Sequence, residues 1–312
     1  MKNKIAIITG VILFVILVSS FFIINNNSKS KNNKGIYCSS EGTLSDTQNI
    51  QSHRSYCIKS NSAEKNYAKN VATEYSFSII NDQGSRVKDF KITHTKIMHV
   101  IVVRKDVAYF QHIHPEFNSQ TGIFTLKDLT FPENGEYRIF ADFVVGSEQK
   151  DSNEIPLVIT ISEDVFVNEK KYVPLELGSE EKTKIFKNYE VTLSEDEEFI
   201  SGKEVIMSFT LKRKGELVTN LEEYLGALGH SVIFKEKTLN FIHTHPKENK
   251  ATSQNGKLEF NVIFPESGKY KIFTQFKHEG KVFTTDFVVT IKKDVKESIQ
   301  SVPLTHKIKI GH

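Results

Sequence analysis

Six of the eleven histidines form a pattern, H-x12-H-x-H, that occurs twice along the 312 residues. Its members are His99, His112 and His114, followed by His230, His243 and His245. Three imidazoles that converge on one point suit a divalent transition metal, because Zn²⁺ accepts three histidines plus water and imidazole also binds Cu(II). Only Met98 and Met207 follow the initiator methionine, so a methionine site for Cu(I) is not indicated. The pattern predicts copper or zinc sites, one in each half of the chain.

Three further side chains could complete these sites, each as a fourth ligand or as a hydrogen-bond partner of a ligand. Asp142 and Gln275 occupy matching positions in the two halves. His94 could join the first site, but its counterpart is Leu225, so the two sites need not be equivalent.

A structural role for the same histidines is the alternative. The face that carries them would also carry Ile101, Val103 and Phe110 in the first half, with Val232, Phe234 and Phe241 as the counterparts in the second. Such apolar residues are typical of a protein core. Because buried polar groups are usually hydrogen-bonded, the histidines could form a hydrogen-bond network there instead of a metal site.

Neighbouring antiparallel β-strands are the elements that would bring each triad together. Residues i and i+2 of a strand point to one face, so His112 and His114 share a face. A two-residue loop, Lys105-Asp106, would place His99 opposite His112. A four-residue loop, from Lys105 to Ala108, would place His99 opposite His114 instead. Either even length keeps the triad on one face, whereas an odd length would break it.

The second half of the chain predicts the same arrangement. A loop at Glu236-Lys237 would place His230 opposite His243. His243 and His245 share a face for the same reason as their counterparts.

Both patterns belong to a duplicated segment. Residues 84–115 match residues 215–246 at a constant offset of 131. After a variable loop, FPENGEYRIFADF (131–143) matches FPESGKYKIFTQF (264–276) at an offset of 133. Agreement of this length indicates an internal repeat.

Each copy has the sequence pattern of a β-sandwich. Short runs rich in Val, Ile, Phe and Tyr alternate with turns of Gly, Pro, Asn and Lys, and no long segment after the N-terminus has helical periodicity. This predicts an all-β fold with two tandem Ig-like sandwiches of about seven strands each. Gly135 and Gly268 are typical of turns that open a strand. Tyr137 and Tyr270 are expected in the cores with their hydroxyls hydrogen-bonded.

The N-terminus predicts a transmembrane helix. Residues 5–24, IAIITGVILFVILVSSFFII, carry no charge and follow Lys2 and Lys4. A helix of this length spans about 30 Å, the thickness of the hydrocarbon core of a bilayer. The lysines favour a cytoplasmic N-terminus, so this single-pass anchor would leave the C-terminal part extracytoplasmic, at the cell membrane. A cleaved signal peptide is the alternative, but Val18-Ser19-Ser20 is a poor cleavage site.

The chain therefore divides into six predicted segments. They are a membrane anchor at 1–24, a flexible stalk with the cysteine segment at 25–70, a first sandwich at 71–162, a linker at 163–188, a second sandwich at 189–292 and a polar tail at 293–312. The two cysteines, Cys38 and Cys57, are predicted to form a disulfide, which an extracytoplasmic location permits. Two unpaired thiols are the alternative.

Charge and motifs narrow the class of function. A net charge of +3 with scattered lysines gives no nucleic-acid footprint. The sequence has no G-x-S-x-G, no H-E-x-x-H and no Gly-rich phosphate loop, so we expect no enzyme. The expected partners are the membrane and a metal-acceptor protein. Four histidines match nothing in the repeat and are expected in solvent: His53, His278, His306 and His312.

Three segments resemble uncharacterised secreted or membrane-anchored bacterial proteins: KIMHVIVVRKDVAYFQHIHPE, FPENGEYRIFADF and LGALGHSVIF. LGALGH is also distantly similar to the M-P-x-M-G-H signature of YtkA-like and FixH-like domains, Ig-like sandwiches associated with copper handling or oxidase assembly. This resemblance implies an Ig-like fold and metal handling. Leu225 and Leu228 replace the methionines of that signature, which argues against Cu(I).

The combined expectation is a membrane-anchored extracytoplasmic protein that captures, buffers or delivers copper or zinc. The alternative is a non-catalytic Ig-like structural or interaction module on the cell surface.

Overall fold

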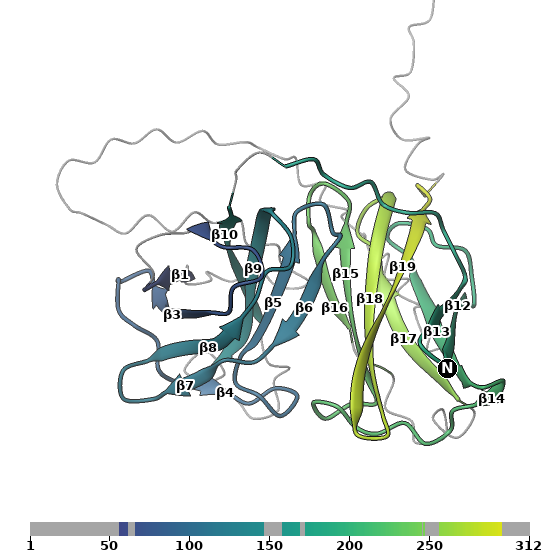
Figure 1. The fold of residues 1–312 in the computed structure, drawn as a ribbon, viewed down its shortest axis with the longest axis horizontal. Helices are drawn as coiled ribbons and strands as arrows, with labels where there is room; N and C mark the ends of the chain where they lie inside the picture. Colours follow the sequence, from purple (N-terminus) through teal and green to yellow (C-terminus); the bar gives the residue numbers. More distant parts are fainter. Residues whose placement is uncertain are drawn as a thin grey trace, which may run out of the picture. The chain divides into compact units, whose positions relative to one another are not determined.

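The computed structural model describes residues 56–61, 66–146, 158–168, 172–244, 246 and 256–294. Within these ranges the helix and strand elements are all β-strands (Figure 1), which confirms the predicted all-β fold. No helix that could cross a bilayer occurs among them. The predicted anchor at 5–24 lies outside the described residues, and so do Cys38, His53, His245, His306 and His312.

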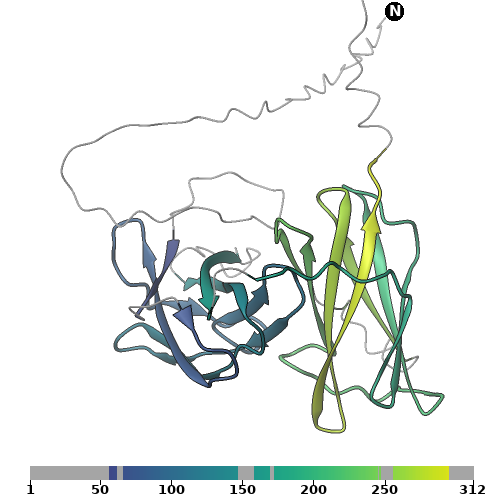
Figure 2. The ribbon, with the colours of Figure 1, turned by 45° about the horizontal axis from the view of Figure 1, so that its top comes forward.

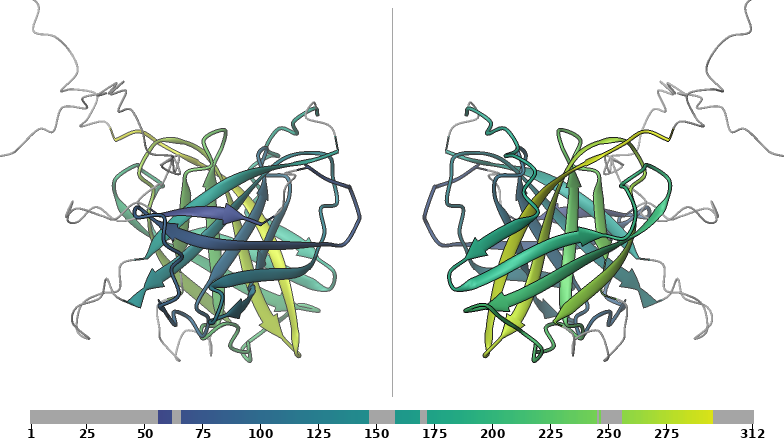
Figure 3. Two further views of the ribbon diagram at one scale, coloured as in Figure 1. Left: turned by 90° about the vertical axis from the view of Figure 1, so that its left-hand side faces the viewer. Right: turned by 90° about the vertical axis from the view of Figure 1, so that its right-hand side faces the viewer.

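The first sandwich consists of two sheets. One has the strand order β1 (Tyr56–Ser60), β3 (Thr73–Asn81), β8 (Ile123–Leu129), β7 (Glu116–Asn118). The other has the order β2 (Asn66–Tyr67), β10 (Ile159–Val167), β9 (Gly135–Val145), β5 (His99–Arg104), β6 (Phe110–Ile113), and β4 (Phe90–Lys91) pairs with β9. β2 is parallel to β10, and the other pairs are antiparallel. Figure 3 shows β1 running beside β3.

The second sandwich repeats this plan with two antiparallel sheets. One contains β11 (Thr183–Phe186), β12 (Tyr189–Glu195), β13 (Glu204–Arg213) and β14 (Glu216–Leu217), and β17 (Lys257–Ile263) also pairs with β13. The other has the order β16 (Phe241–Thr244), β15 (Gly229–Lys235), β18 (Gly268–His278), β19 (Lys281–Ile291). β18 and β19 form a long hairpin (Figure 2).

The two sandwiches begin and end at positions that differ from the predicted boundaries. β1 and β2 precede the predicted start at 71, and β10 continues to Val167, beyond the predicted end at 162. β1 is part of the first sandwich because Tyr56 and Ile58, two residues apart, pack against its core. Cys57 lies between them and is disulfide-bonded. β11 likewise begins inside the predicted linker of 163–188.

Matching residues support both cores. Gly135 and Gly268 open β9 and β18, each with a φ of 130°, as predicted. Tyr137 and Tyr270 are fully buried, and each hydroxyl donates to the backbone carbonyl four residues upstream, at 2.7 and 2.9 Å. Such a bond between a strand and the preceding corner is typical of Ig-like sandwiches.

Alternation along β5 gives its two faces different neighbours. Val100 and Val102 point into the first sandwich and pack in its core with Phe77. The intervening Ile101 and Val103 belong to a separate apolar cluster that contains residues of both sandwiches. Every residue of β5 is buried, because a different layer covers each face. The face that carries the histidines therefore lies between the sandwiches, and not in either core as the sequence suggested.

Matched residues exchange contacts across this interface. Phe110 stacks on Phe273 with ring centroids 4.6 Å apart, and Phe140 stacks on Phe241 at 5.3 Å. In the repeat, Phe110 corresponds to Phe241 and Phe140 to Phe273. Such reciprocal contacts are the pattern of an isologous interface between two copies of one surface.

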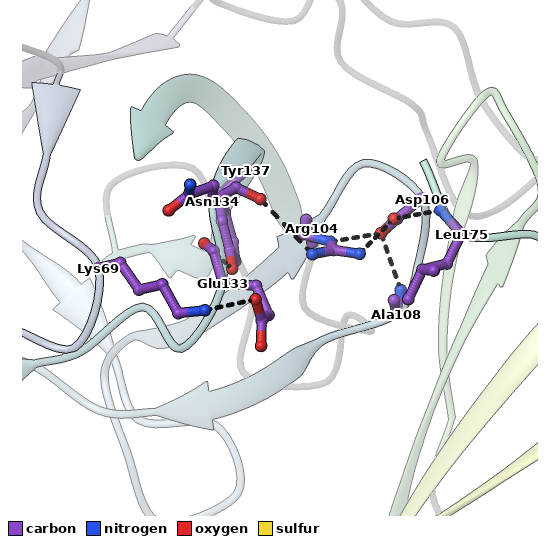
Figure 4. A network of polar contacts seen from close by, with 8 residues as sticks. All are labelled: Lys69, Arg104, Asp106, Ala108, Glu133, Asn134, Tyr137 and Leu175. Carbon is purple, nitrogen blue, oxygen red and sulfur yellow. Dashed lines mark hydrogen bonds and ion pairs between the residues drawn. The ribbon is translucent and has the colours of Figure 1, made fainter. Parts of the chain in front are cut away.

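A buried ion pair fixes the hairpin between β5 and β6 (Figure 4). Arg104 donates from Nε and Nη2 to the two carboxylate oxygens of Asp106, at 2.8 and 2.6 Å. Asp106 also accepts from the backbone N–H of Ala108 at 3.1 Å and of Leu175, in the segment between the sandwiches, at 2.8 Å. The loop is therefore held from both sides.

This loop has four residues, 105–108, because the Arg104 N–H donates to the carbonyl of Tyr109 at 3.1 Å. Ile101 pairs with His112, and the same register places His99 opposite His114. The four-residue alternative is thus confirmed for the first hairpin. The two-residue loop predicted for the second hairpin is wrong. Val232 of β15 pairs with His243 of β16, and the Lys235 N–H donates to the carbonyl of Asn240, so this loop also has four residues, 236–239. Both loops keep an even length, so the histidines stay on one face.

Replacing Asp106 by alanine should lower the free energy of unfolding by about 3 kcal/mol, because it would leave the buried guanidinium of Arg104 without its counter-ion. The side chains of this pair are only 6% and 2% exposed. Urea unfolding of the purified protein measures the effect. The matched control is Glu116→Ala, which removes an exposed pair with Lys127 and should change stability little. Equal effects of the two substitutions would contradict a role of Asp106 in holding the hairpin.

Candidate metal centre

The described histidines of the repeated pattern gather with His94 in one cluster between the sandwiches. The first sandwich contributes His94, His99, His112 and His114, and the second contributes His230 and His243. Neighbouring ring centroids lie 4.9 to 6.2 Å apart. Two separate sites were predicted, one in each repeat. The structure unites them because the histidine face of each sheet lies against the other sandwich.

Three members of the cluster have the spacing of metal ligands. His99 Nδ1 lies 3.1 Å from His112 Nε2 and 3.2 Å from His114 Nε2. One nitrogen from each of these residues lies within 4.8 Å of the other two. Two nitrogens bound to one tetrahedral zinc ion at about 2.0 to 2.1 Å are about 3.3 Å apart. The triad is therefore close to the arrangement that a single ion requires.

Hydrogen bonds on the outer side of the triad determine which nitrogens carry protons. His99 Nε2–H donates to the carbonyl of Thr93 at 3.0 Å. His112 Nδ1–H donates to Gln275 Oε1 at 3.0 Å, and the amide of Gln275 is oriented by its own donation to Thr284 Oγ1 at 3.3 Å. Both partners are oxygens that only accept. In the neutral rings, the inner nitrogens His99 Nδ1 and His112 Nε2 therefore both carry lone pairs, and these face each other.

Two lone pairs at 3.1 Å repel each other, and a cation between them removes this repulsion. Burial, with smaller contributions from neighbouring histidines, lowers the pKa of His99 to about 4 and of His114 to about 3. Burial also lowers the pKa of His112 well below its usual range. A proton is thus a poor candidate for this cation at neutral pH, whereas neutral imidazole is the form that binds a metal ion.

The histidines of the second sandwich are held in the same way. His230 Nε2–H donates to the carbonyl of Tyr224 at 2.6 Å, which matches the bond from His99 to Thr93. Burial lowers the pKa of His230 to about 3. His243 Nδ1–H donates to Asp142 Oδ2 at 3.1 Å.

Asp142 and Gln275 each accept a hydrogen bond from a histidine of the other repeat. Asp142 accepts from His243 of the second sandwich, and Gln275 accepts from His112 of the first. Each is steadied by a threonine directly opposite it on the next strand. The sequence identified both residues as partners of the histidines but assigned each to its own repeat, because nothing in the spacing shows that the two sheets face each other.

His94 lies at the edge of the cluster. Its ring centroid is 6.2 Å from that of His99 and 6.1 Å from that of His230. It has a φ of 47°, and its counterpart Leu225 has a φ of 57°, so both repeats use the same tight turn before the histidine strand. His94, one of the three residues predicted as a possible fourth ligand or hydrogen-bond partner, is therefore near the triad but outside its compact group.

His278 was expected in solvent, and this is wrong. It is only 5% exposed, because it follows the buried Phe276 by two residues on the same face of β18. Its Nε2–H donates to Asn220 Oδ1 at 3.0 Å, and Nδ1 lies 2.7 Å from the hydroxyl of Tyr189, which donates to it. The donating nitrogen of His278 thus faces an acceptor, and its accepting nitrogen faces a hydroxyl donor.

Comparison with known proteins identifies a family. The model described as "Domain of unknown function (DUF8832)" matches residues 57–157 and 183–293. The two matches cover more than half of the chain, so the chain belongs to this family and contains its domain twice. This confirms the internal repeat. No curated protein matches the chain significantly.

Several solved structures are distantly similar. They include Salmonella alpha-2-macroglobulin reacted with methylamine (9% identity, TM-score 0.23, 76% of this chain and 15% of that one). The fibronectin(III)-like modules of Clostridium thermocellum CbhA match with 9% identity and a TM-score of 0.21, over 81% of this chain and all of that one. Parabacteroides merdae beta-glucuronidase matches with 12% identity and a TM-score of 0.19, over 77% of this chain and 24% of that one. Similarities this low have no bearing on function.

The buried rings predict a dependence of stability on pH. Below the ordinary histidine pKa of 6.5, the unfolded chain protonates His99 and His230, while the folded chain keeps them neutral down to pH values of about 4 and about 3. Because the unfolded state then binds more protons, the free energy of unfolding should fall as the pH is lowered through this window. The free energy of unfolding decreases by up to about 1.4 kcal/mol per pH unit for each histidine. Above pH 6.5, each buried neutral histidine makes its full contribution to stability.

Urea unfolding of the metal-free protein at a series of pH values from about 7.5 to about 4.5 measures this slope. In the His230→Leu variant, the free energy of unfolding should change less steeply with pH, because one proton fewer is taken up on unfolding. A free energy of unfolding that stays constant across the window would contradict burial of the neutral rings.

Proposed function

We propose that this member of the DUF8832 family is a metal-binding protein that holds one divalent ion of copper or zinc at His99, His112 and His114. The observation that carries the proposal is the pair of facing lone pairs on His99 Nδ1 and His112 Nε2, 3.1 Å apart, with both outer nitrogens committed to oxygen acceptors. An ion at the centre of the triad turns this repulsion into coordination. Outer acceptors of this kind normally orient metal-binding histidines.

The proposed role is capture, buffering or delivery of the ion at the outer face of a cell membrane. The uncharged segment 5–24 supports the membrane anchor, and the disulfide bond of Cys57 supports an oxidising compartment. The resemblance of LGALGH to YtkA-like and FixH-like domains supports metal handling. A metal-acceptor protein is the proposed partner. We propose no catalytic activity, because His99 and His112 are 1% and 5% exposed, which leaves little access for a substrate.

A structural role of the cluster is the second candidate. The stacked pairs Phe110–Phe273 and Phe140–Phe241 beside the histidines show that the interface also packs through apolar contacts. On this hypothesis the histidines would only connect the sandwiches, and a chelator would not change the stability of the protein.

Isothermal titration of the tag-free protein with Zn²⁺ and with Cu²⁺ distinguishes the two candidates. We expect one ion per chain, and we expect this binding to be lost in the His99→Ala and His112→Ala variants, because each removes a ligand. The matched control is His278→Asn, which replaces a buried histidine outside the cluster and should bind like the parent. Absence of binding by the parent, or unchanged binding by the His99 and His112 variants, would contradict the proposed function.

A further inference from the structure

The second sandwich presents one histidine to two members of the triad. The ring centroid of His243 lies 5.8 Å from that of His112 and 6.0 Å from that of His99. Within the triad the corresponding separations are 4.9 to 5.3 Å. Two imidazoles bound to one tetrahedral ion have centroids about 5 Å apart, so His243 needs to move by only about 1 Å to join them.

A buried carboxylate orients this histidine. Asp142 Oδ2 accepts from His243 Nδ1–H at 3.1 Å, and the two side chains are only 7% and 8% exposed. The other oxygen, Oδ1, accepts from Thr160 Oγ1 at 2.7 Å, so the carboxylate is held at both ends. With Nδ1 engaged in this way, Nε2 is the nitrogen that can bind an ion. A carboxylate behind a ligand histidine fixes the ring and makes it a stronger ligand.

The other histidines of the cluster are less suitable. His230 contacts the triad at His112, with centroids 6.0 Å apart, and His94 contacts it at His99, at 6.2 Å. His243 is near both His99 and His112, and its ring is held by the carboxylate of Asp142.

We propose that His243 is the fourth ligand of the ion at the triad, so that the ion bridges the two sandwiches, and that Asp142 is the positioning residue for this ligand. The inference rests on the proposed function and extends it. Four protein ligands without an open position are typical of a structural zinc site. The ion then binds the docked arrangement of the sandwiches more tightly than any other, and by linkage it stabilises docking to the same extent. Loading with metal thereby changes how firmly the sandwiches are joined.

The test uses the full-length, tag-free chain and Zn²⁺ alone, with two measurements. Isothermal titration gives the affinity, and limited proteolysis reports whether Zn²⁺ protects residues 172–182, between β10 and β11, from cleavage. In His243→Ala we expect one ion per chain, bound at least about tenfold more weakly, and loss of the protection. In Asp142→Asn, which leaves the ring of His243 in place, we expect binding roughly 10- to 100-fold weaker. The matched control is His278→Asn, which replaces a buried histidine of β18 outside the cluster and should keep both the affinity and the protection.

The outcomes separate this inference from the proposed function. Affinity and protection like those of the parent in both His243→Ala and Asp142→Asn would overturn the bridging ion while leaving the triad site intact. A loss in His278→Asn as large as that in His243→Ala would also overturn it. If His243→Ala does not fold, as circular dichroism would show, the Asp142→Asn result decides. Absence of binding by the parent would contradict the proposed function itself.

Discussion

The histidine cluster depends on the hydrogen bonds that leave its outer side. His99 donates to a backbone carbonyl and His112 donates to the amide oxygen of Gln275. Neither acceptor can return a proton, so each bond fixes one tautomer and leaves a lone pair on the inner nitrogen. His278 shows the contrast, since its hydroxyl and amide partners satisfy both nitrogens without any ion. Burial lowers the pKa values of the clustered rings. The rings are therefore neutral at neutral pH, which is the form that binds a metal.

Neither repeat builds this arrangement by itself. The acceptor of His112 comes from the second sandwich and the acceptor of His243 comes from the first. Equivalent phenylalanine pairs stack beside them in the same reciprocal manner. An isologous interface between two copies of a surface places equivalent residues together, so a duplicated triad-bearing domain can form one composite centre in a single chain. The apolar stacks supply association, and the crossed hydrogen bonds set the orientation of the rings.

The sequence predicted the all-β fold, the duplication and the histidines that form the cluster. Strand periodicity and the match between the two repeats can both be seen in the sequence alone. The sequence also restricted the register of the first hairpin to two even-length loops, and the structure has the longer one, in which Asp106 pairs with Arg104. The union of the two sites was not predictable. Ile101 and Val103 look like core residues in the sequence, yet the layer that covers them is the other sandwich. Alternation shows that a face is buried but does not show what buries it. His278 was missed for a similar reason, since its neighbours in the core come from distant strands.

Anomalous X-ray diffraction from crystals of the zinc-loaded protein would test the central claim most directly. The predicted result is a zinc peak about 2.0 to 2.1 Å from His99 Nδ1 and from one nitrogen each of His112 and His114. Zinc located elsewhere in the chain, or a cluster that stays free of zinc in these crystals, would contradict the claim.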